Sequence, residues 1–429
     1  MVTVDVVKVA LVATLAAAFV ALVAVQPSAA SSYAQFGVQD DAWLKYGPGT
    51  LDQRLDTLDR LGVKIVRLTV RWDQVAPTKP SNERDPFDPA YVWGAYGATL
   101  DGLHARRIPV VLTLWAAPRW ANGGHRPNVL PRAGFGNFAY AAAKRFPWVR
   151  QWTIWNEPNT HMFASPVSPK LYTQRLLNPA YVLLHRANRA NRVAGGVTSP
   201  RRTPSGMSPL DFMQGMRRYH ARLDAYAQNP YPASPRETPF STPCSWCTTM
   251  TMATLPQIRA HVTALFGSKP LWLTEYGYQT NPPDRMLGVS PALQARYVGQ
   301  AALRVWEQRG VTLLIHFLVR DEPSLGGWQS GFFTTHGSAK PAGRAFALPF
   351  VERSRRGSRV VLWGQVRPGS GHRRYRLERW TGRSWASVGG TRATDAHGTF
   401  TRVVRGVQGN RFRVRSLSPA VVSPLLTID

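Results

Sequence analysis

The feature of this sequence that most limits its fold is a regular alternation of short apolar runs with longer segments of helical spacing. Eight apolar runs have the length and composition of buried strands, and they fall at residues 33–39, 63–70, 108–114, 151–155, 192–197, 223–227, 271–274 and 311–317. Segments between them repeat apolar residues every three or four positions, over 51–61, 91–106, 135–145, 176–190, 209–222, 255–266 and 291–309. Apolar strands that alternate with helices indicate a parallel sheet covered by those helices. Eight such units close into a (β/α)8 TIM barrel, which with additions to its usual ~250 residues fits this chain.

The pattern changes near Val351, where helical spacing gives way to short segments that alternate apolar and polar residues. These segments lie at 359–366, 375–380, 400–404 and 411–414, and turns containing glycine separate them. Such alternation predicts a small antiparallel β-sandwich. We therefore expect a barrel over residues 31–352 and a C-terminal all-β domain over 353–429, joined through a basic linker at 353–358.

Residues 1–30 have the features of a secretory signal peptide. An apolar run from Val9 to Val25 is followed by small residues at Ser28 and Ala30, which form an A-x-A-like cleavage site. The run is close to the ~20 residues that span a bilayer, so an uncleaved anchor is the alternative. No later segment is long and apolar enough to span a membrane. The sequence thus predicts a secreted or cell-wall-associated protein that does not span the membrane once the signal is removed.

Only two cysteines occur, Cys244 and Cys247, within Cys-Ser-Trp-Cys. A structural zinc site needs four ligands, and a redox Cys-x-x-Cys motif lies where a strand leads into a helix. This pair instead lies in a loop rich in proline, serine and threonine, so a local disulfide is expected in an oxidising compartment. Neither a metal nor another cofactor is expected.

The chain carries a formal net charge of +29, mostly from arginine. Genome-wide bias in codon usage is one explanation for such a composition. Whatever the origin of the charge, its physical consequence is the same, because a secreted protein with this charge should adhere to anionic cell-wall polymers or acidic glycans. No nucleic-acid-binding motif accompanies the charge, so we do not expect a nucleic-acid partner.

Two of the apolar strands deliver a glutamate at their C-terminal ends. Glu157 follows the fourth strand directly before Pro158, which cannot continue a sheet ladder, and Glu275 follows the seventh strand. Side chains at the carboxyl ends of barrel strands converge on the face where active sites lie. One such glutamate alone would be an ordinary surface residue. Two carboxyl groups from different strands are what glycoside hydrolysis requires, so the pair predicts that chemistry.

The motifs around both glutamates resemble those of the clan of retaining (β/α)8 glycoside hydrolases. Trp155-Asn156-Glu157-Pro158-Asn159 and Thr274-Glu275-Tyr276-Gly277 are most similar to its family 39 branch, the β-xylosidase and α-L-iduronidase relatives. The family 5 cellulase-like branch is second. The resemblance covers residues 31–349 and excludes the C-terminal domain.

The resemblance implies a role for each matching residue. Glu157 would be the general acid/base, Glu275 the nucleophile, and Asn156 the residue that hydrogen-bonds the substrate 2-hydroxyl. Arg67, near the end of the second strand, matches an arginine beside the nucleophile, and Tyr231 matches a tyrosine whose hydroxyl holds it. A barrel-rim ion pair and a core aromatic residue are the alternative interpretations of Arg67 and Tyr231.

The sequence departs from the clan pattern at two strands. Asn229-Pro230-Tyr231 stands where this branch often has a histidine before the tyrosine, and the eighth strand lacks the tryptophan that commonly forms a sugar platform. That strand offers His316, which we expect to be a core residue. Trp115 and Trp120 are predicted to stack on sugar rings, because flat apolar faces suit pyranoses, and core packing is the equal alternative for each.

These observations predict a secreted retaining glycosidase that cleaves a poly- or oligosaccharide by a two-step Glu/Glu displacement, with carboxyl groups about 5–5.5 Å apart. One alternative is a carbohydrate-binding protein that kept the cleft and lost turnover. Another is an envelope-adhesion protein in which the basic β-sandwich carries the activity and the barrel is a scaffold. The sequence leaves open the sugar, the linkage and the choice between endo and exo action.

Overall fold

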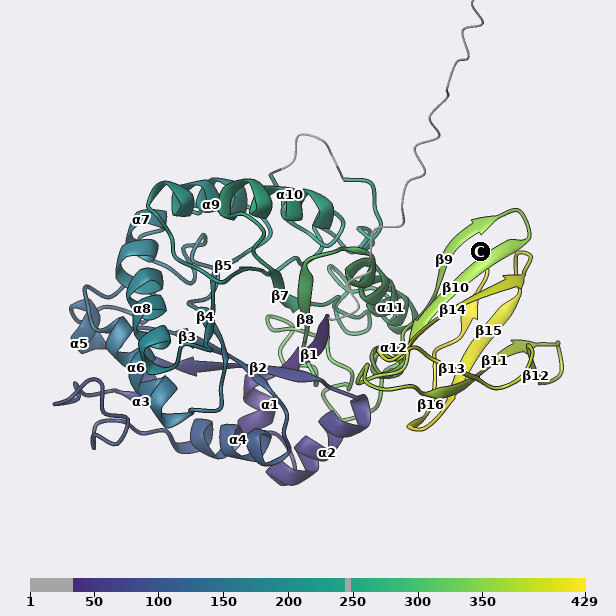
Figure 1. Ribbon diagram of the computed structural model, residues 1–429, viewed down its shortest axis with the longest axis horizontal. Coiled ribbons are helices and arrows are strands. Elements are labelled where there is room, and N and C mark those ends of the chain that lie inside the picture. The colour runs from purple at the N-terminus through teal and green to yellow at the C-terminus, as the bar shows by residue number, and fades with distance from the viewer. Residues whose placement is uncertain (1–33, 244–247) are drawn as a thin grey trace, which may run out of the picture.

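The computed structural model describes residues 34–243 and 248–429 of the chain (Figure 1). Eight parallel strands form a closed barrel in which each strand pairs with the next and β8 pairs with β1. The strands are β1 Gln35–Gln39, β2 Ile65–Arg71, β3 Val110–Trp115, β4 Gln151–Ile154, β5 Arg192–Thr198, β6 Ala225–Gln228, β7 Leu271–Tyr276 and β8 Val311–Phe317. The predicted (β/α)8 barrel is confirmed.

The main helices surround this barrel on its outer side (Figure 1). They are α2 Leu51–Leu61, α4 Gly94–Ala105, α6 Phe135–Arg145, α8 Asn178–Ala187, α9 Pro209–Arg218, α10 Leu255–Phe266, α11 Pro291–Glu307 and α12 Pro341–Ala347. Shorter helices are α1 Asp41–Tyr46, α3 Trp72–Val75, α5 Arg119–Asn122 and α7 Pro169–Leu171, and residues Tyr172–Leu177 form the π-helical segment η1. The helix expected at 176–190 therefore starts as η1 and becomes α-helical only at Asn178.

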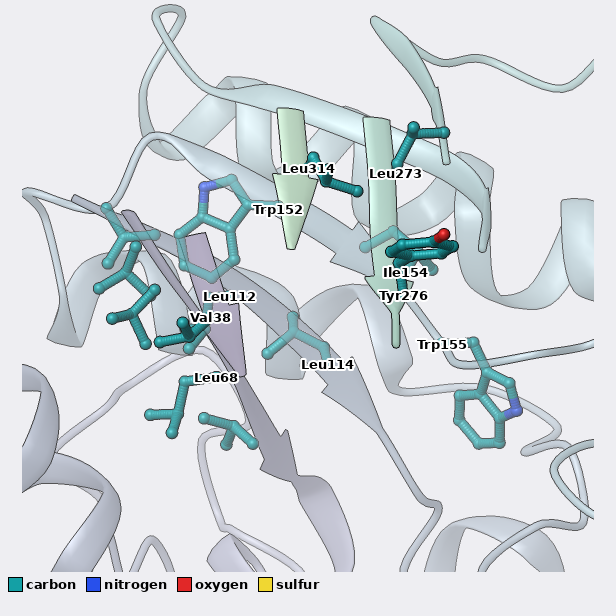
Figure 2. Packing of buried hydrophobic residues seen from close by; sticks show 14 of the residues in the cluster. Val38, Leu68, Leu112, Leu114, Trp152, Ile154, Trp155, Leu273, Tyr276 and Leu314 are labelled. Atoms are coloured by element: carbon teal, nitrogen blue, oxygen red, sulfur yellow. The ribbon is translucent and has the colours of Figure 1, made fainter. Parts of the chain in front are cut away.

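Side chains of the barrel strands alternate between two apolar layers. Outward-facing residues such as Leu68, Leu112 and Trp152 pack with the helices in one large core, part of which Figure 2 shows. Inward-facing residues, among them Ile65 and Val111, fill the barrel interior as a second cluster. Because successive strand residues point to opposite faces, every second residue is directed to the barrel axis. This alternation sets which polar side chains reach the site.

Two antiparallel sheets form the C-terminal domain, as predicted. One sheet has the order β14-β10-β9, and the other has the order β12-β11-β15-β16, with β13 beside β11 and β17 beside β15. The strands are β9 Phe350–Arg356, β10 Arg359–Gln365, β11 Arg374–Trp380, β12 Trp385–Ser387, β13 Arg392–Ala393, β14 Thr399–Arg405, β15 Arg411–Leu417, β16 Ala420–Val422 and β17 Leu426–Thr427. The two sheets enclose their own apolar core.

The prediction of a basic linker at 353–358 is wrong, because most of this segment belongs to a strand. Residues 353–356 are the second half of β9, and Gly357, with a φ of 57°, makes the turn into β10. Arg355 and Arg356 in this hairpin end are exposed and Arg353 pairs with Glu307, so their charge does not disturb the ladder between β9 and β10. The chain enters the second domain directly after α12, near Pro349.

Aromatic and charged contacts hold the second domain against the barrel. Trp363 of β10 packs on Trp306 of α11 with ring centroids 5.6 Å apart. Arg367, after β10, is buried, and its guanidinium lies 4.0 Å from the ring of Phe36 and 4.2 Å from that of Phe346. Within the described residues, the Nε and Nη1 atoms of Arg367 have no hydrogen-bond partner.

Two of the predictions concern residues outside the described ranges. These are the signal peptide at 1–30 and the disulfide between Cys244 and Cys247. Within 34–243 and 248–429, no helix combines the length and the apolar character needed to cross a bilayer.

Candidate active site

Glu157 and Glu275 lie at the carboxyl ends of β4 and β7, at the same end of the barrel. The chain turns sharply after β4 because Trp155 and Glu157 adopt left-handed conformations, with φ of 67° and 38°. A left-handed backbone at a non-glycine residue costs on the order of 1–3 kcal/mol and must be held by its surroundings. Here the Glu157 N–H donates to the carbonyl of Val197, at the end of β5, over 2.9 Å. The strand end therefore fixes Glu157 through its backbone.

Arg67 lies at the centre of this end of the barrel, at an inward position of β2, and is fully buried. Its Nη1 atom forms an ion pair with a carboxylate oxygen of Glu275, and its Nη2 atom donates to Asn156 Oδ1 over 3.1 Å. Further donations reach Thr113 Oγ1 at 2.9 Å, Gln39 Oε1 at 2.5 Å and the Thr274 carbonyl at 3.2 Å. One guanidinium thus connects residues of β1, β2, β3 and β7 with Asn156 after β4.

The segment after β6 supports both carboxyl groups. Tyr231 donates its hydroxyl to Glu275 Oε2 over 3.1 Å, and Asn229 donates from Nδ2 to Glu157 Oε1 over 3.1 Å. Thr274 fixes the orientation of the Asn229 amide by donating its hydroxyl to Oδ1 over 2.8 Å. In the sequence, Asn229 stood out only as a departure from the clan pattern. No spacing in the sequence predicts its contact with Glu157.

The surroundings of the two carboxyl groups differ in a way that affects the proton of Glu157. Burial, followed by the charge of Glu275, raises the pKa of Glu157 to about 8, although the Asn229 hydrogen bond and Arg67 act in the opposite direction. Glu157 is therefore largely protonated at neutral pH. Glu275 accepts hydrogen bonds from Arg67 and Tyr231, and burial raises the pKa of Tyr231 well above its usual value, so Tyr231 remains a donor.

A pocket of about 560 Å³ opens above these groups and includes Asn156, Glu157, Tyr231 and Glu275 in its wall. Its polar wall further comprises Gln39, Asp41, Lys45, Thr69, Arg71 and Arg201, and its aromatic wall includes Tyr96, Trp115, Phe163, Phe317 and Trp328. Arg67 lies behind the pocket and contacts Glu275 from below the surface.

The two tryptophans expected to stack on sugars are placed differently. Trp115, at the end of β3, lines the pocket, with the Arg71 guanidinium 4.7 Å from its ring centroid. Trp120, on α5, does not line it. The Trp120 ring packs edge-on against Trp72 at 5.2 Å, and its Nε1 atom donates to the Ala76 carbonyl over 2.9 Å. The structure thus gives Trp120 a packing role, because α5 faces α3 and not the barrel mouth.

Trp328 is a pocket residue that the sequence did not reveal. It lies in the long loop between β8 and α12, and its ring is 4.6 Å from Tyr231 and 5.7 Å from Phe317. The eighth strand itself lacks the tryptophan that commonly forms a sugar platform in the clan. A residue eleven positions beyond the strand end supplies an aromatic ring there, and only the path of the loop reveals it.

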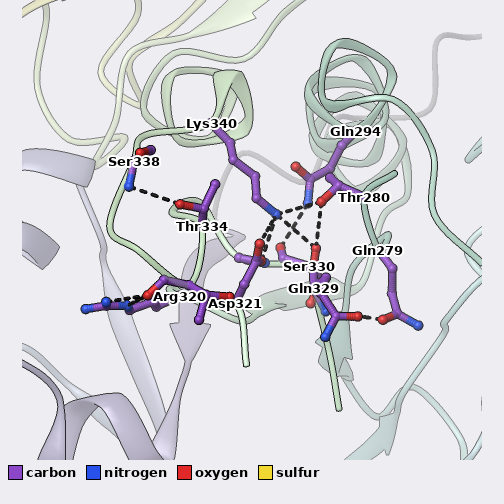
Figure 3. Close-up of polar contacts among 12 residues, drawn as sticks. Gln279, Thr280, Gln294, Arg320, Asp321, Gln329, Ser330, Thr334, Ser338 and Lys340 are labelled. Carbon is purple, nitrogen blue, oxygen red and sulfur yellow. Dashed lines mark hydrogen bonds and ion pairs between the residues drawn. The ribbon is translucent and has the colours of Figure 1, made fainter. Parts of the chain in front are cut away.

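A buried ion pair holds the Trp328 loop in place (Figure 3). Lys340 donates from Nζ to Asp321 Oδ1 over 2.7 Å, to Thr280 Oγ1 over 2.8 Å and to the Gln329 carbonyl over 2.9 Å. Both charged side chains are almost inaccessible to solvent. Lys340 therefore ties the β8–α12 loop to the loop after β7 directly beside Trp328.

His316 is a core residue, as expected. Its Nε2 atom lies 2.9 Å from the Ser330 carbonyl, its ring stacks on Phe332 at 4.2 Å, and burial lowers its pKa to about 3. Over the two described ranges, no group of three or more His, Cys, Asp or Glu side chains is arranged to hold a metal ion.

Comparison with known proteins places the fold of this chain among solved (β/α)8 glycoside hydrolase structures. No protein-family model matches the chain, and no curated protein matches it in sequence. Solved structures do match over most of its length. A monomeric β-xylosidase from Caulobacter crescentus CB15 has a TM-score of 0.57 and 14% identity, over 87% of this chain and 94% of that one.

Two further neighbours belong to the families named by the motifs. A GH39 enzyme from Xanthomonas axonopodis pv. citri has a TM-score of 0.56 and 14% identity, over 91% of this chain and 94% of that one. A GH5_18 enzyme from Streptomyces cattleya in complex with GlcNAc has a TM-score of 0.53 and 17% identity, over 73% of this chain and 78% of that one. The resemblance to family 39, with family 5 second, is confirmed at the level of the fold.

Proposed function

We propose that this protein is a secreted retaining glycosidase that cleaves O-glycosidic bonds of an oligo- or polysaccharide. The observation that carries the proposal is the unequal support of two carboxyl groups in one pocket. Desolvation raises the pKa of Glu157 to about 8, and Glu275 accepts hydrogen bonds from Arg67 and Tyr231. A carboxyl group that keeps its proton, beside a second one that accepts hydrogen bonds from an arginine and a tyrosine, meets the needs of proton donation and nucleophilic attack.

The chemistry would proceed in two steps. Protonated Glu157 donates its proton to the glycosidic oxygen while a Glu275 oxygen attacks the anomeric carbon, so the leaving group departs as an alcohol and a glycosyl ester remains on Glu275. Glu157, now ionised, removes a proton from water, which attacks the same carbon and releases Glu275. The Asn229 amide supports the ionised form of Glu157 between the two steps.

Asn156 and the aromatic wall would position the sugar. The Asn156 carbonyl oxygen accepts from Arg67, which leaves its amide free to donate toward the pocket and the substrate 2-hydroxyl. Trp115 and Trp328 offer apolar faces for sugar rings on different parts of the wall. We place Trp120 outside this binding surface.

A labelling experiment tests the nucleophile. A panel of activated 2-deoxy-2-fluoro glycosides should inactivate the enzyme with a covalent label on Glu275, located by peptide mass spectrometry. Glu352→Gln, which alters a carboxylate of the β9–β10 hairpin that pairs with Arg355, serves as the control and should be labelled normally. A label on any other residue of an active enzyme would remove Glu275 from this role.

Leaving-group dependence tests the acid. Glu157→Ala should lose most activity on substrates with poor leaving groups and retain much more on activated aryl glycosides, since those need no proton donor. Similar losses on both substrates would argue against Glu157 as the acid. Sugar binding without turnover by the unmodified protein would instead support a carbohydrate-binding protein.

We also infer secretion from residues 1–30. N-terminal sequencing of protein recovered from culture medium should find a mature chain that starts near Ser31. A chain that still begins at residue 1 and is found in the membrane fraction would support the alternative of an uncleaved anchor.

A further inference from the structure

One face of the second domain carries charge and aromatic rings that the active site does not use. On β11, Tyr375 and Leu377 point into the domain core, and the residues that alternate with them point to solvent. The same alternation on β15 directs every second residue outward, and three of these residues are arginines, Arg411, Arg413 and Arg415. We call the set Arg374, Arg376, Arg413, Arg415, Trp380 and Trp385 the arginine face.

The arginine face is poor in counter-charge. Arg376 and Arg415 stand directly opposite each other on neighbouring strands, an arrangement of like charges that destabilises a sheet. Glu378 is the acidic residue on this face, and it is already bonded to Arg413 at 2.5 Å and Arg415 at 3.3 Å. In the described part of the chain, neither Arg374 nor Arg376 forms an ion pair. A bound anion would relieve the repulsion between these side chains.

Two tryptophans lie at one end of the same face. Trp380 and Trp385 are cross-strand partners with ring centroids 5.4 Å apart, and both are partly exposed. The Arg413 guanidinium lies 4.2 Å from the Trp385 ring, so charge and apolar ring are adjacent. Aromatic rings beside cations suit a ligand that carries both flat apolar faces and negative groups, as sugar acids do.

The use of arginine, and not lysine, also limits which kinds of anionic ligand this face can bind. Residues 350–429 contain sixteen arginines, no lysine and four acidic residues. A guanidinium presents a planar fork that matches a carboxylate with two parallel hydrogen bonds, whereas an ammonium does not. The arginine face therefore suits a polymer with repeated carboxylates.

We propose that the arginine face binds a carboxylated polysaccharide and holds the barrel close to it. The choice of a glycan over a single-stranded nucleic acid rests on the proposed glycosidase function, whereas binding itself does not depend on turnover. The face lies on β11, β12 and β15, away from α11 (Figure 1), and none of its residues lines the active-site pocket. It is therefore a separate binding surface on the same chain.

The experiment compares two triple variants of the full-length protein with equal charge change. Arg374→Gln/Arg376→Gln/Arg415→Gln alters the arginine face. Arg356→Gln/Arg359→Gln/Arg405→Gln alters an equally exposed arginine cluster of the β14-β10-β9 sheet, where no tryptophan lies within the cluster. Affinity is measured by biolayer interferometry on immobilised polygalacturonate, with neutral arabinoxylan and a single-stranded DNA 30-mer as the other probes.

We expect the first variant to bind polygalacturonate about tenfold more weakly or worse, and the second to lose less than about threefold. Trp385→Ala should also weaken this binding. Equal losses in both triple variants would show an effect of net charge and would overturn the proposal, as would the absence of wild-type binding or tighter binding to DNA. Thermal unfolding of each variant checks that the domain is intact.

Hydrolysis of a small aryl glycoside separates this inference from the proposed function. The first triple variant should keep the wild-type rate, because its changes are remote from the pocket. A chain that binds polygalacturonate through the arginine face and hydrolyses no glycoside would refute the proposed function and leave this surface in place.

Discussion

Asn229→Ala should move the alkaline limit of activity to higher pH. The amide of the fully buried Asn229 donates to Glu157 Oε1 over 3.1 Å, and this bond favours the ionised carboxylate. Its loss makes ionisation harder, so Glu157 should keep its proton, and its ability to act as an acid, to a higher pH.

The size of the effect follows from the contact. A hydrogen bond to a charged group contributes about 1.5–3 kcal/mol, and each pH unit corresponds to about 1.4 kcal/mol. The amide also binds the protonated carboxyl group, so roughly half of that energy distinguishes the two forms. From a starting pKa of about 8, the alkaline limit should rise by about one pH unit.

The assay is the pH dependence of kcat/KM on a substrate with a poor leaving group, because only such a substrate requires the Glu157 proton. Tyr231→Phe is the matched control, since it removes one hydrogen bond from Glu275 in place of one from Glu157. Tyr231→Phe should lower the rate and leave the alkaline limit unchanged.

Two results would refute this reasoning. An alkaline limit of Asn229→Ala that stays in place or falls would show that the amide does not stabilise the ionised Glu157. An equal upward movement in Tyr231→Phe would show that the limit reports a general change in the pocket and not the Asn229 contact.

Three further predictions concern stability and the pocket wall. Lys340→Met leaves Asp321 buried and unpaired, so the free energy of unfolding in urea should fall by about 3–5 kcal/mol, and Lys340→Met/Asp321→Leu should recover much of it. Trp328→Ala should raise KM by roughly tenfold with a smaller change in kcat, as initial rates will show; an unchanged KM would place Trp328 outside the sugar contact. Arg367→Met keeps apolar packing and removes a buried charge, so it should stabilise the protein by about 1–3 kcal/mol in thermal unfolding; a loss of stability would mean that the contacts with Phe36 and Phe346 outweigh the burial of charge.

The barrel and the position of its two glutamates were predictable because both depend on local pattern. Strands buried on both faces leave continuous apolar runs, and a strand of known order delivers its last residues to a known end of the barrel. Glu157 and Glu275 therefore lie together as expected, and Arg67 and Tyr231 reach Glu275 from the strands to which the resemblance assigned them.

The parts that were not predictable depend on loops and on side-chain direction. Trp328 reaches the pocket through a loop whose path is fixed by a buried ion pair, and Lys340 and Asp321 are nineteen residues apart in sequence. Trp120 follows the end of β3 closely in sequence, yet on α5 its ring packs against Trp72 and does not face the barrel mouth. Short strands such as β13 and β17 contain two residues each, too few for any periodicity to appear.

The contacts of Arg67 separate the residues that carry out the chemistry from the wall residues that contact the sugar. Its Nε atom donates to Thr113, its Nη1 atom to Gln39 and Glu275, and its Nη2 atom to Asn156. The guanidinium therefore has few N–H groups left to bind a sugar hydroxyl. The charged centre can therefore stay constant while substrate choice changes through wall residues that bear no strand-to-strand bonds. A lineage with this arrangement could acquire new sugars by altering loops alone, without rebuilding the chemistry beneath them.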